Sequence, residues 1–171
     1  RSLFARDFSI PFNTTRLDWS GFDFSGYDFS GFSFDALRNF NFSGCNLSFA
    51  NFKGLDLSGI NFSGANLSGA FFDVFNLFSG INWSGANLTG INWSGIDLRG
   101  FDFSGVDLSF TNFSGFDLSG INFSGANLRG VNFSFANLRW CNFIGSDLSG
   151  ANLSFAFAID VDWSSFFHSD L

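Results

Sequence analysis

A period of five residues governs the chain from Leu17 to Trp163. A typical unit reads small or apolar, Asn or Asp, Phe or Leu, Ser, Gly, and residues 65–69 and 121–125 are two copies. We call the Phe or Leu the centre of its unit. This period matches neither the helix, with a period of about 3.6, nor the flat strand, with a period of about two. It predicts a chain that turns after each short extended piece.

The polarity of each unit indicates which side chains face inward. Side chains alternate along an extended piece, so the centre and the residue two before it point the same way. These two positions are the apolar ones, and we expect them to fill the interior. The Asn or Asp, Ser and Gly positions should face solvent or form the corner. Gly provides positive φ at a corner, and Asn or Asp can bond to the neighbouring backbone there.

The repeated units resemble the pentapeptide-repeat family, whose motif is A(D/N)LXX. The resemblance covers residues 17–163 and implies an all-β fold, a right-handed quadrilateral parallel β-helix with four units per coil. About seven coils would follow, stacked at the strand spacing of about 4.8 Å. We expect residues 1–16 to form an N-terminal cap, residues 17–163 the pentapeptide-repeat β-helix, and residues 164–171 a C-terminal cap or interface segment.

Two further patterns lie within the repeat. Centres alternate between an aromatic residue and Leu, which predicts aromatic columns on two opposite faces and Leu columns on the other two. The period also breaks after the predicted centre Phe34, near 35–39, and after the predicted centre Leu77, near 78–80. Such insertions usually become bulges or loops; a loop that contacts a partner is the alternative. One aromatic column should read Trp83, Phe103, Phe123, Phe143, Trp163.

Charge and hydropathy restrict the partners. A net charge of −7 and a pI near 4.2 argue against direct binding of nucleic acid, which needs clustered Lys and Arg. No stretch is long and apolar enough for a signal peptide or a membrane span, which favours a cytoplasmic protein. The chain begins at Arg1, so a removed leader remains open.

The sequence contains no recognisable catalytic or metal-binding constellation. The single His, His168, lies near the C-terminus. Cys45 and Cys141 are both expected to point inward, about 23 Å apart by strand spacing, too far for a disulfide. No metal-ligand spacing or phosphate-binding loop is present, and Ser and Asp occur as ordinary repeat positions. We therefore expect no enzyme activity, no cofactor and no metal.

Aromatic residues at corners form the first candidate surface. Phe49, Phe110, Phe135, Trp140 and Phe155 stand where the repeat usually has Gly. Exposed clustered aromatics are typical of interfaces, although the rings could instead fold over the corners and pack on backbone. The C-terminal end should be covered by a second copy, as a homodimer or end-to-end assembly, or by a different protein. The predicted partner-binding residues are Phe135, Trp140, Phe155, Phe157, Phe166 and Phe167.

An acidic belt is the second candidate surface. Its members stand at the outward position before a centre, and they are Asp97, Asp102, Asp107 and Asp117. Solubility is one role for them. The family resemblance suggests another, because some members protect DNA gyrase from quinolones and are thought to mimic DNA. Here, however, the acids form rings and not a stripe, and Arg99 dilutes them. Our leading hypothesis is a non-enzymatic scaffold that binds a protein partner; the alternative is a DNA-mimic regulator of a type II topoisomerase.

Overall fold

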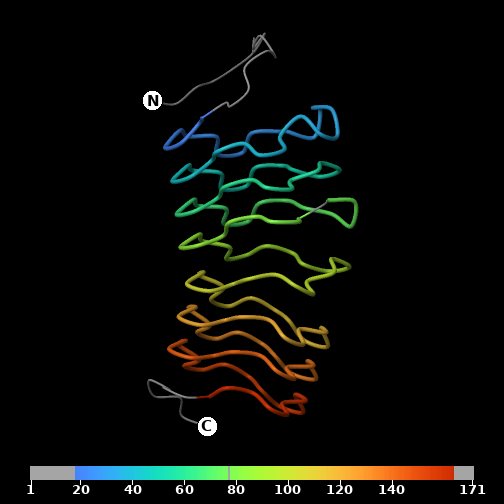
Figure 1. Cartoon of the computed structure of the whole chain (residues 1–171), viewed down its shortest axis with the longest axis vertical. Helices are drawn as coiled ribbons and strands as arrows, with labels where there is room; N and C mark the ends of the chain where they lie inside the picture. The colour runs from blue at the N-terminus through green and yellow to red at the C-terminus, as the bar shows by residue number, and fades with distance from the viewer. Residues whose placement is uncertain (1–17, 77, 164–171) are drawn as a thin grey trace.

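The computed structural model describes residues 18–76 and 78–163, which form a rod of stacked coils (Figure 1). Each extended piece is so short that it pairs with the next coil at a single residue, always in parallel. The described residues therefore contain no helix and no longer strand. Asn41 pairs with Asn61, and Asp102 with Asn122, which is a spacing of 20 residues, or four units, in each case. These pairs confirm the predicted parallel solenoid built from five-residue units.

The four sides of the rod are defined by the outward Asn or Asp that precedes each centre. We number them in chain order as faces 1 to 4. Face 1 contains Asn41, Asn61, Asn82, Asp102, Asn122 and Asn142; face 2 contains Asn46, Asn66, Asn87, Asp107, Asn127 and Asp147; face 3 contains Asn51, Phe71, Asn92, Asn112, Asn132 and Asn152; and face 4 contains Asp56, Asp97, Asp117, Asn137 and Phe157.

Backbone hydrogen bonds join consecutive coils wherever a bridge forms. The Phe42 amide donates to the Asn61 carbonyl over 2.8 Å, and the Asn61 amide donates to the Phe40 carbonyl over 3.0 Å. At the corner that follows, the last residue of the unit takes a left-handed φ, as at Gly125 with +65°. A Cβ atom crowds this conformation, which explains why Gly dominates the position.

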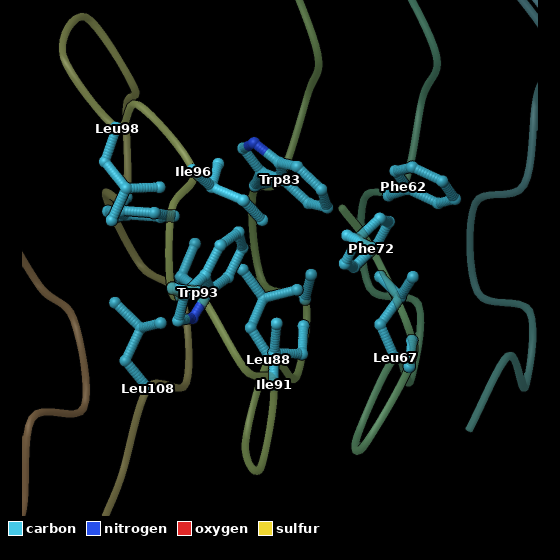
Figure 2. Packing of buried hydrophobic residues seen from close by; sticks show 14 of the residues in the cluster. Phe62, Leu67, Phe72, Trp83, Leu88, Ile91, Trp93, Ile96, Leu98 and Leu108 are labelled. Atoms are coloured by element: carbon cyan, nitrogen blue, oxygen red, sulfur yellow. The ribbon is translucent and has the colours of Figure 1, made fainter. Parts of the chain in front are cut away.

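Columns of stacked rings fill two opposite sides of the interior. Under face 1, Phe123 stacks on Phe143 with centroids 5.1 Å apart, and under face 3, Phe52 stacks on Phe72 at 5.6 Å. Rings of the two columns meet edge to face within a coil. Leu residues line the interior under face 2, among them Leu67, Leu88 and Leu108 (Figure 2). The predicted alternation of aromatic and Leu columns is therefore confirmed, and each ring pair contributes about 0.5–1.5 kcal/mol beyond burial.

The first insertion lies earlier than the sequence pattern indicated. Pairing advances by 23 residues from Asp28 to Asn51, three more than a regular coil. Phe34, predicted as a centre, is 50% exposed, whereas Leu37 is fully buried in its place. The extra residues therefore precede Leu37, so the predicted centre Phe34 is wrong, while the predicted break near 35–39 overlaps residues 30–36, which contain them. Leu37 continues the inward Leu column below face 4 without the volume change that a Phe ring would impose.

The second insertion is also displaced from its predicted position near 78–80. Asn61 pairs with Asn82, 21 residues on, and the turn after the centre Phe72 comes one residue late, at residues 74–75, so the additional residue lies among 73–75. Phe78 packs on Phe72 with ring centroids 5.5 Å apart, so it takes the inward position predicted for Leu77. Leu77 itself lies outside the described residues.

The coil after this insertion loses most of its backbone pairing with its neighbours. Among the described residues, no bridge joins Asn82 to Asp102, Asn92 to either adjacent coil, or Asp97 to Asp117. We call residues 91–101 the seam. Face 2 alone continues past it, through the pairs of Asn87 with Asn66 and Asp107. In Figure 1 the coils at this level stay close along one edge of the rod and spread apart along the other.

The seam also interrupts the aromatic columns. Trp83 stacks on Phe101, with centroids 6.4 Å apart, and not on Phe103 as predicted. Beyond the seam the predicted column is confirmed, because stacked pairs run from Phe103 through Phe123 and Phe143 to Trp163. The rod therefore consists of two well-stacked blocks that share a continuous ladder on one face.

Candidate protein-binding surfaces

An aromatic cluster stands on the corners near the C-terminal end of the described chain. Phe135 and Phe155 occupy the same corner of successive coils, as predicted, and their rings stack with centroids 5.1 Å apart. They are 64% and 81% exposed, so the stack stands largely in solvent. Nearby, the Arg139 guanidinium lies over the rings of Trp140 and Phe157, at 4.6 and 5.2 Å from their centroids.

We call these five residues, Phe135, Arg139, Trp140, Phe155 and Phe157, the aromatic corner patch. Cation–π contact with Arg139 holds Trp140 and Phe157 in place although both rings are exposed. Phe166 and Phe167, predicted to belong to the same surface, lie outside the described residues, as does His168. Of the six aromatic residues that the sequence singled out, the structure places Phe135 against Phe155, and Trp140 and Phe157 against Arg139.

The other two corner aromatics behave differently. The rings of Phe49 and Phe110 lie over Gly69 and Gly130 of the following coil, where an added Cβ would come within 2.7 Å of the ring. The interpretation that corner rings pack on backbone therefore applies to these two. In the patch, by contrast, Phe135 lies against another ring, and that ring is itself open to solvent.

Each corner aromatic takes an unfavourable backbone conformation. Phe135, Trp140 and Phe155 have φ values of +59°, +59° and +58°. A left-handed conformation costs an L-residue with a Cβ atom roughly 1–2 kcal/mol, and Gly serves the same corners elsewhere without that cost. An outlier of this kind, kept where a smaller residue would be more stable, is typical of functional positions.

The acidic belt is built into the ladder of side chains on the rod surface. Asp102, Asp107 and Asp117 each accept a hydrogen bond from an Asn side chain of the following coil, over 3.1, 3.0 and 2.9 Å. Each also accepts one from the backbone amide two residues on. The belt spreads over faces 1, 2 and 4 and forms no acidic stripe along the rod.

Asp97 differs from the rest of the belt because it holds an arginine. Nη2 of Arg99 donates to its carboxylate over 2.6 Å and Nε over 2.9 Å. These hydrogen bonds, together with the Arg99 backbone amide, lower the pKa of Asp97 to about 2. The carboxylate therefore stays ionised in moderately acidic solution, while its charge is largely compensated.

Both cysteines are buried and free, as the sequence predicted. Desolvation raises the pKa of the Cys141 thiol to about 11 and raises that of Cys45 as well, so both thiols are poor nucleophiles. Residues 18–76 and 78–163 contain no group of three His, Cys, Asp or Glu side chains that could hold a metal ion. In the same part of the chain, no helix is long and apolar enough to cross a membrane.

Sequence reasoning missed an apolar group beside the second insertion. Phe71, Val74 and Phe75 are all exposed, and Phe75 is the most exposed of the three. Phe71 gave a usable signal, since it replaces the Asn or Asp expected before the centre Phe72. Val74 gave a similar signal, since it stands at the position where the repeat usually has Gly, whereas Phe75 gave none because its exposure depends on where the extra residue enters the coil.

Solved structures with a similar chain path include three proteins that are related only distantly in sequence. One is HetL, a pentapeptide repeat protein involved in heterocyst differentiation regulation in the cyanobacterium Nostoc sp. strain PCC 7120, at 22% identity over 86% of each chain and a TM-score of 0.38. Another is full-length QnrB1, a plasmid-mediated fluoroquinolone resistance protein, at 21% identity over 84% of this chain and 94% of that one, with a TM-score of 0.35. A third is the pentapeptide repeat protein Rfr23 from the cyanobacterium Cyanothece 51142, at 20% identity over 85% and 80% of the chains and a TM-score of 0.26.

A search of curated proteins finds no match. The family model described as pentapeptide repeats (8 copies) matches residues 37–76, 81–120, 107–145 and 121–156. These matches span most of the chain and coincide with the coils described above. The chain therefore belongs to the pentapeptide-repeat family.

Proposed function

We propose that this chain is a non-enzymatic scaffold that binds a protein partner through the aromatic corner patch. In this proposal the chain forms a right-handed rod of about seven coils, spaced at about 4.8 Å. The partner is a second copy of the chain or a different protein, and the experiment below separates the two.

The observation that carries the proposal is the stacked, solvent-exposed pair of Phe135 and Phe155 on left-handed backbone. Exposed rings that are already fixed lose little conformational freedom when a partner covers them, which favours binding. Arg139 fixes Trp140 in the same way. Aromatic residues and Arg are also the types most enriched at the energetic centres of interfaces.

A photocrosslinking experiment tests the proposal. A benzophenone amino acid replaces Phe155 in the full chain, and the matched control carries it at Phe110, an equally exposed corner aromatic outside the patch. Irradiation in cells should give a discrete protein adduct from position 155 and none from position 110. A cross-linked dimer of the chain identifies a second copy as the partner. Equal adducts from both positions, or none from either, would overturn the proposal.

The alternative, a DNA mimic that binds a type II topoisomerase, relies on the acidic belt. Its members lie on different faces, and Arg99 compensates Asp97, so the charge does not follow one long side of the rod. This arrangement supports the aromatic patch over mimicry. A gyrase supercoiling assay with and without a fluoroquinolone compares them: mimicry requires inhibition or protection that is lost when Asp97, Asp102, Asp107 and Asp117 are changed to Asn.

A further inference from the structure

A cleft of about 630 Å³ opens at the seam on the side of face 4, opposite the continuous ladder of face 2. Residues before the seam form one wall, among them Asp73, Phe78 and Trp83. The residues Asp97, Phe101 and Asp102 form the other wall. Figure 2 shows that Trp83 turns its indole nitrogen toward Ile96, which also lines the cleft.

Backbone groups at the seam lack the partners that they have elsewhere in the rod. In regular coils the amides of the centre and of the residue before it donate to carbonyls of the adjacent coils. The Phe123 amide, for example, donates to the Asn142 carbonyl, and the Asn142 amide donates to the Ile121 carbonyl. Among the described residues, the amides of Trp83 and Asp102, which both line the cleft, donate no backbone hydrogen bond. At the seam the backbone bridges between adjacent coils are therefore lost on three of the four faces.

The charged side chains that line the cleft indicate which kind of ligand it could bind. Three carboxylates and one guanidinium line it, and Arg99 is committed to Asp97. Asp73 and Asp102 have no cationic partner among the described residues; each uses Oδ1 to accept backbone amide hydrogens, and Asp102 accepts from Asn122 as well. Two partly buried rings, Phe78 and Phe101, also line the cleft, and aromatic faces attract cations.

From these observations we propose that the cleft binds an extended basic segment of a partner protein, which pairs its backbone with the seam and places Arg or Lys side chains on Asp73 and Asp102. Addition of a strand supplies main-chain hydrogen bonds, while pockets beside it select alternate side chains. Carboxylates next to aromatic rings suit a guanidinium or ammonium group. This site goes beyond the aromatic corner patch, because it lies at the middle of the rod and uses none of the patch residues.

Binding of a defined peptide tests the proposal. The probe is a labelled peptide of about eight alternating Arg and Thr residues, a usual strand length, and the control peptide has Glu in place of Arg. The change Asp73→Asn with Asp102→Asn removes the charge of the cleft. The matched control, Asp107→Asn with Asp147→Asn, removes the same charge from face 2. Fluorescence anisotropy gives the affinity of the full chain and of each variant, and thermal unfolding checks that all are folded.

We expect the Arg peptide to bind, the Glu peptide not to bind, and the cleft variant to lose about tenfold or more in affinity. The face 2 variant should stay within about twofold of the unchanged chain. Equal losses in both variants would show mere attraction to an acidic surface, and equal binding of both peptides would show an unselective apolar groove; either result overturns the proposal, as does absence of binding. An unchanged peptide affinity in a Phe135→Ala, Phe155→Ala variant separates this site from the proposed function.

Discussion

Replacement of Phe123 by Leu should show how much the ring columns stabilise the rod. Phe123 is fully buried, and it stacks on Phe103 and Phe143 and meets Phe133 edge to face. Leu keeps the site apolar but removes all three ring pairs, each of which contributes about 0.5–1.5 kcal/mol beyond burial. Even truncation of a buried Phe to Ala costs only about 3–5 kcal/mol. We therefore expect Phe123→Leu to lower the free energy of unfolding by about 1.5–3 kcal/mol.

Urea unfolding followed by tryptophan fluorescence measures this loss, with Trp163 reporting from the same column. The control is Phe135→Leu, which removes a single stacked pair at the surface. It should cost less than about 1 kcal/mol. If both changes cost the same, stacking in the interior adds nothing beyond burial and the reasoning fails. If Phe123→Leu changed the slope of the unfolding free energy against urea concentration, the coils would no longer unfold together.

Three further predictions concern single positions. Gly130→Ala should destabilise the fold by about 1–3 kcal/mol in urea unfolding, because φ is +64° and the new Cβ meets the Phe110 ring; a neutral result would contradict that packing. Cys141, whose pKa burial raises to about 11, should not react with a disulfide reagent near pH 8 until the chain is unfolded, and rapid reaction of the folded protein would refute its burial. Asp97, whose pKa Arg99 lowers to about 2, should stabilise the fold above its usual titration range and lose that effect as pH falls toward 2. Arg99→Gln should raise that pKa toward its ordinary value in an NMR titration, and an unchanged pKa would exclude the ion pair.

The distribution of Asp has a physical explanation in the side-chain ladder. Asn donates through Nδ2 to the Oδ1 of the previous coil, as Asn61 does to Asn41. A carboxylate accepts hydrogen bonds but donates none, so Asp is favoured where the previous coil presents no acceptor at the same position. Asp18, Asp23 and Asp28 open the first block, and most of the acidic belt opens the second. Most of the belt therefore marks the start of a ladder, a role that requires no partner, whereas Asp107 continues the face 2 ladder from Asn87.

Asp107, Asp147 and Asp162 depart from this pattern, because each pairs with an Asn of the coil behind it. Asp147 follows Asn127 on face 2 and has an acceptor behind it. Here Nη1 of Arg129 lies 3.4 Å from Oδ2 of Asp147 and supplies the donor that the carboxylate lacks. Arg99 plays the same part beside Asp97 and Asp117, since its charge helps to lower the pKa of Asp117 after the hydrogen bonds from Ser119. Arg129 and Arg99 therefore lie at two of the places where the ladder would otherwise bring acceptors together.

The sequence by itself determined the unit of this fold and the direction of its side chains. A period of five sets a turn after each extended piece, and alternation within the piece fixes which residues are buried. For that reason the ring and Leu columns, the buried thiols and the shared corner of Phe135 and Phe155 could all be predicted. Each of these depends on spacing along the chain and on a constant number of units per coil.

Only the tertiary structure decided where the inserted residues enter and where the coils separate. Leu37 and Phe78 point inward at the positions where the sequence pattern predicted Phe34 and Leu77. An inserted residue shifts the register of the residues around it. Packing against adjacent coils then selects among shifts that the local pattern leaves equivalent. The cleft at the seam follows from the same cause. Residues 91–101 repeat as regularly as any others, so nothing in their own spacing indicates that they lose pairing with the adjacent coils.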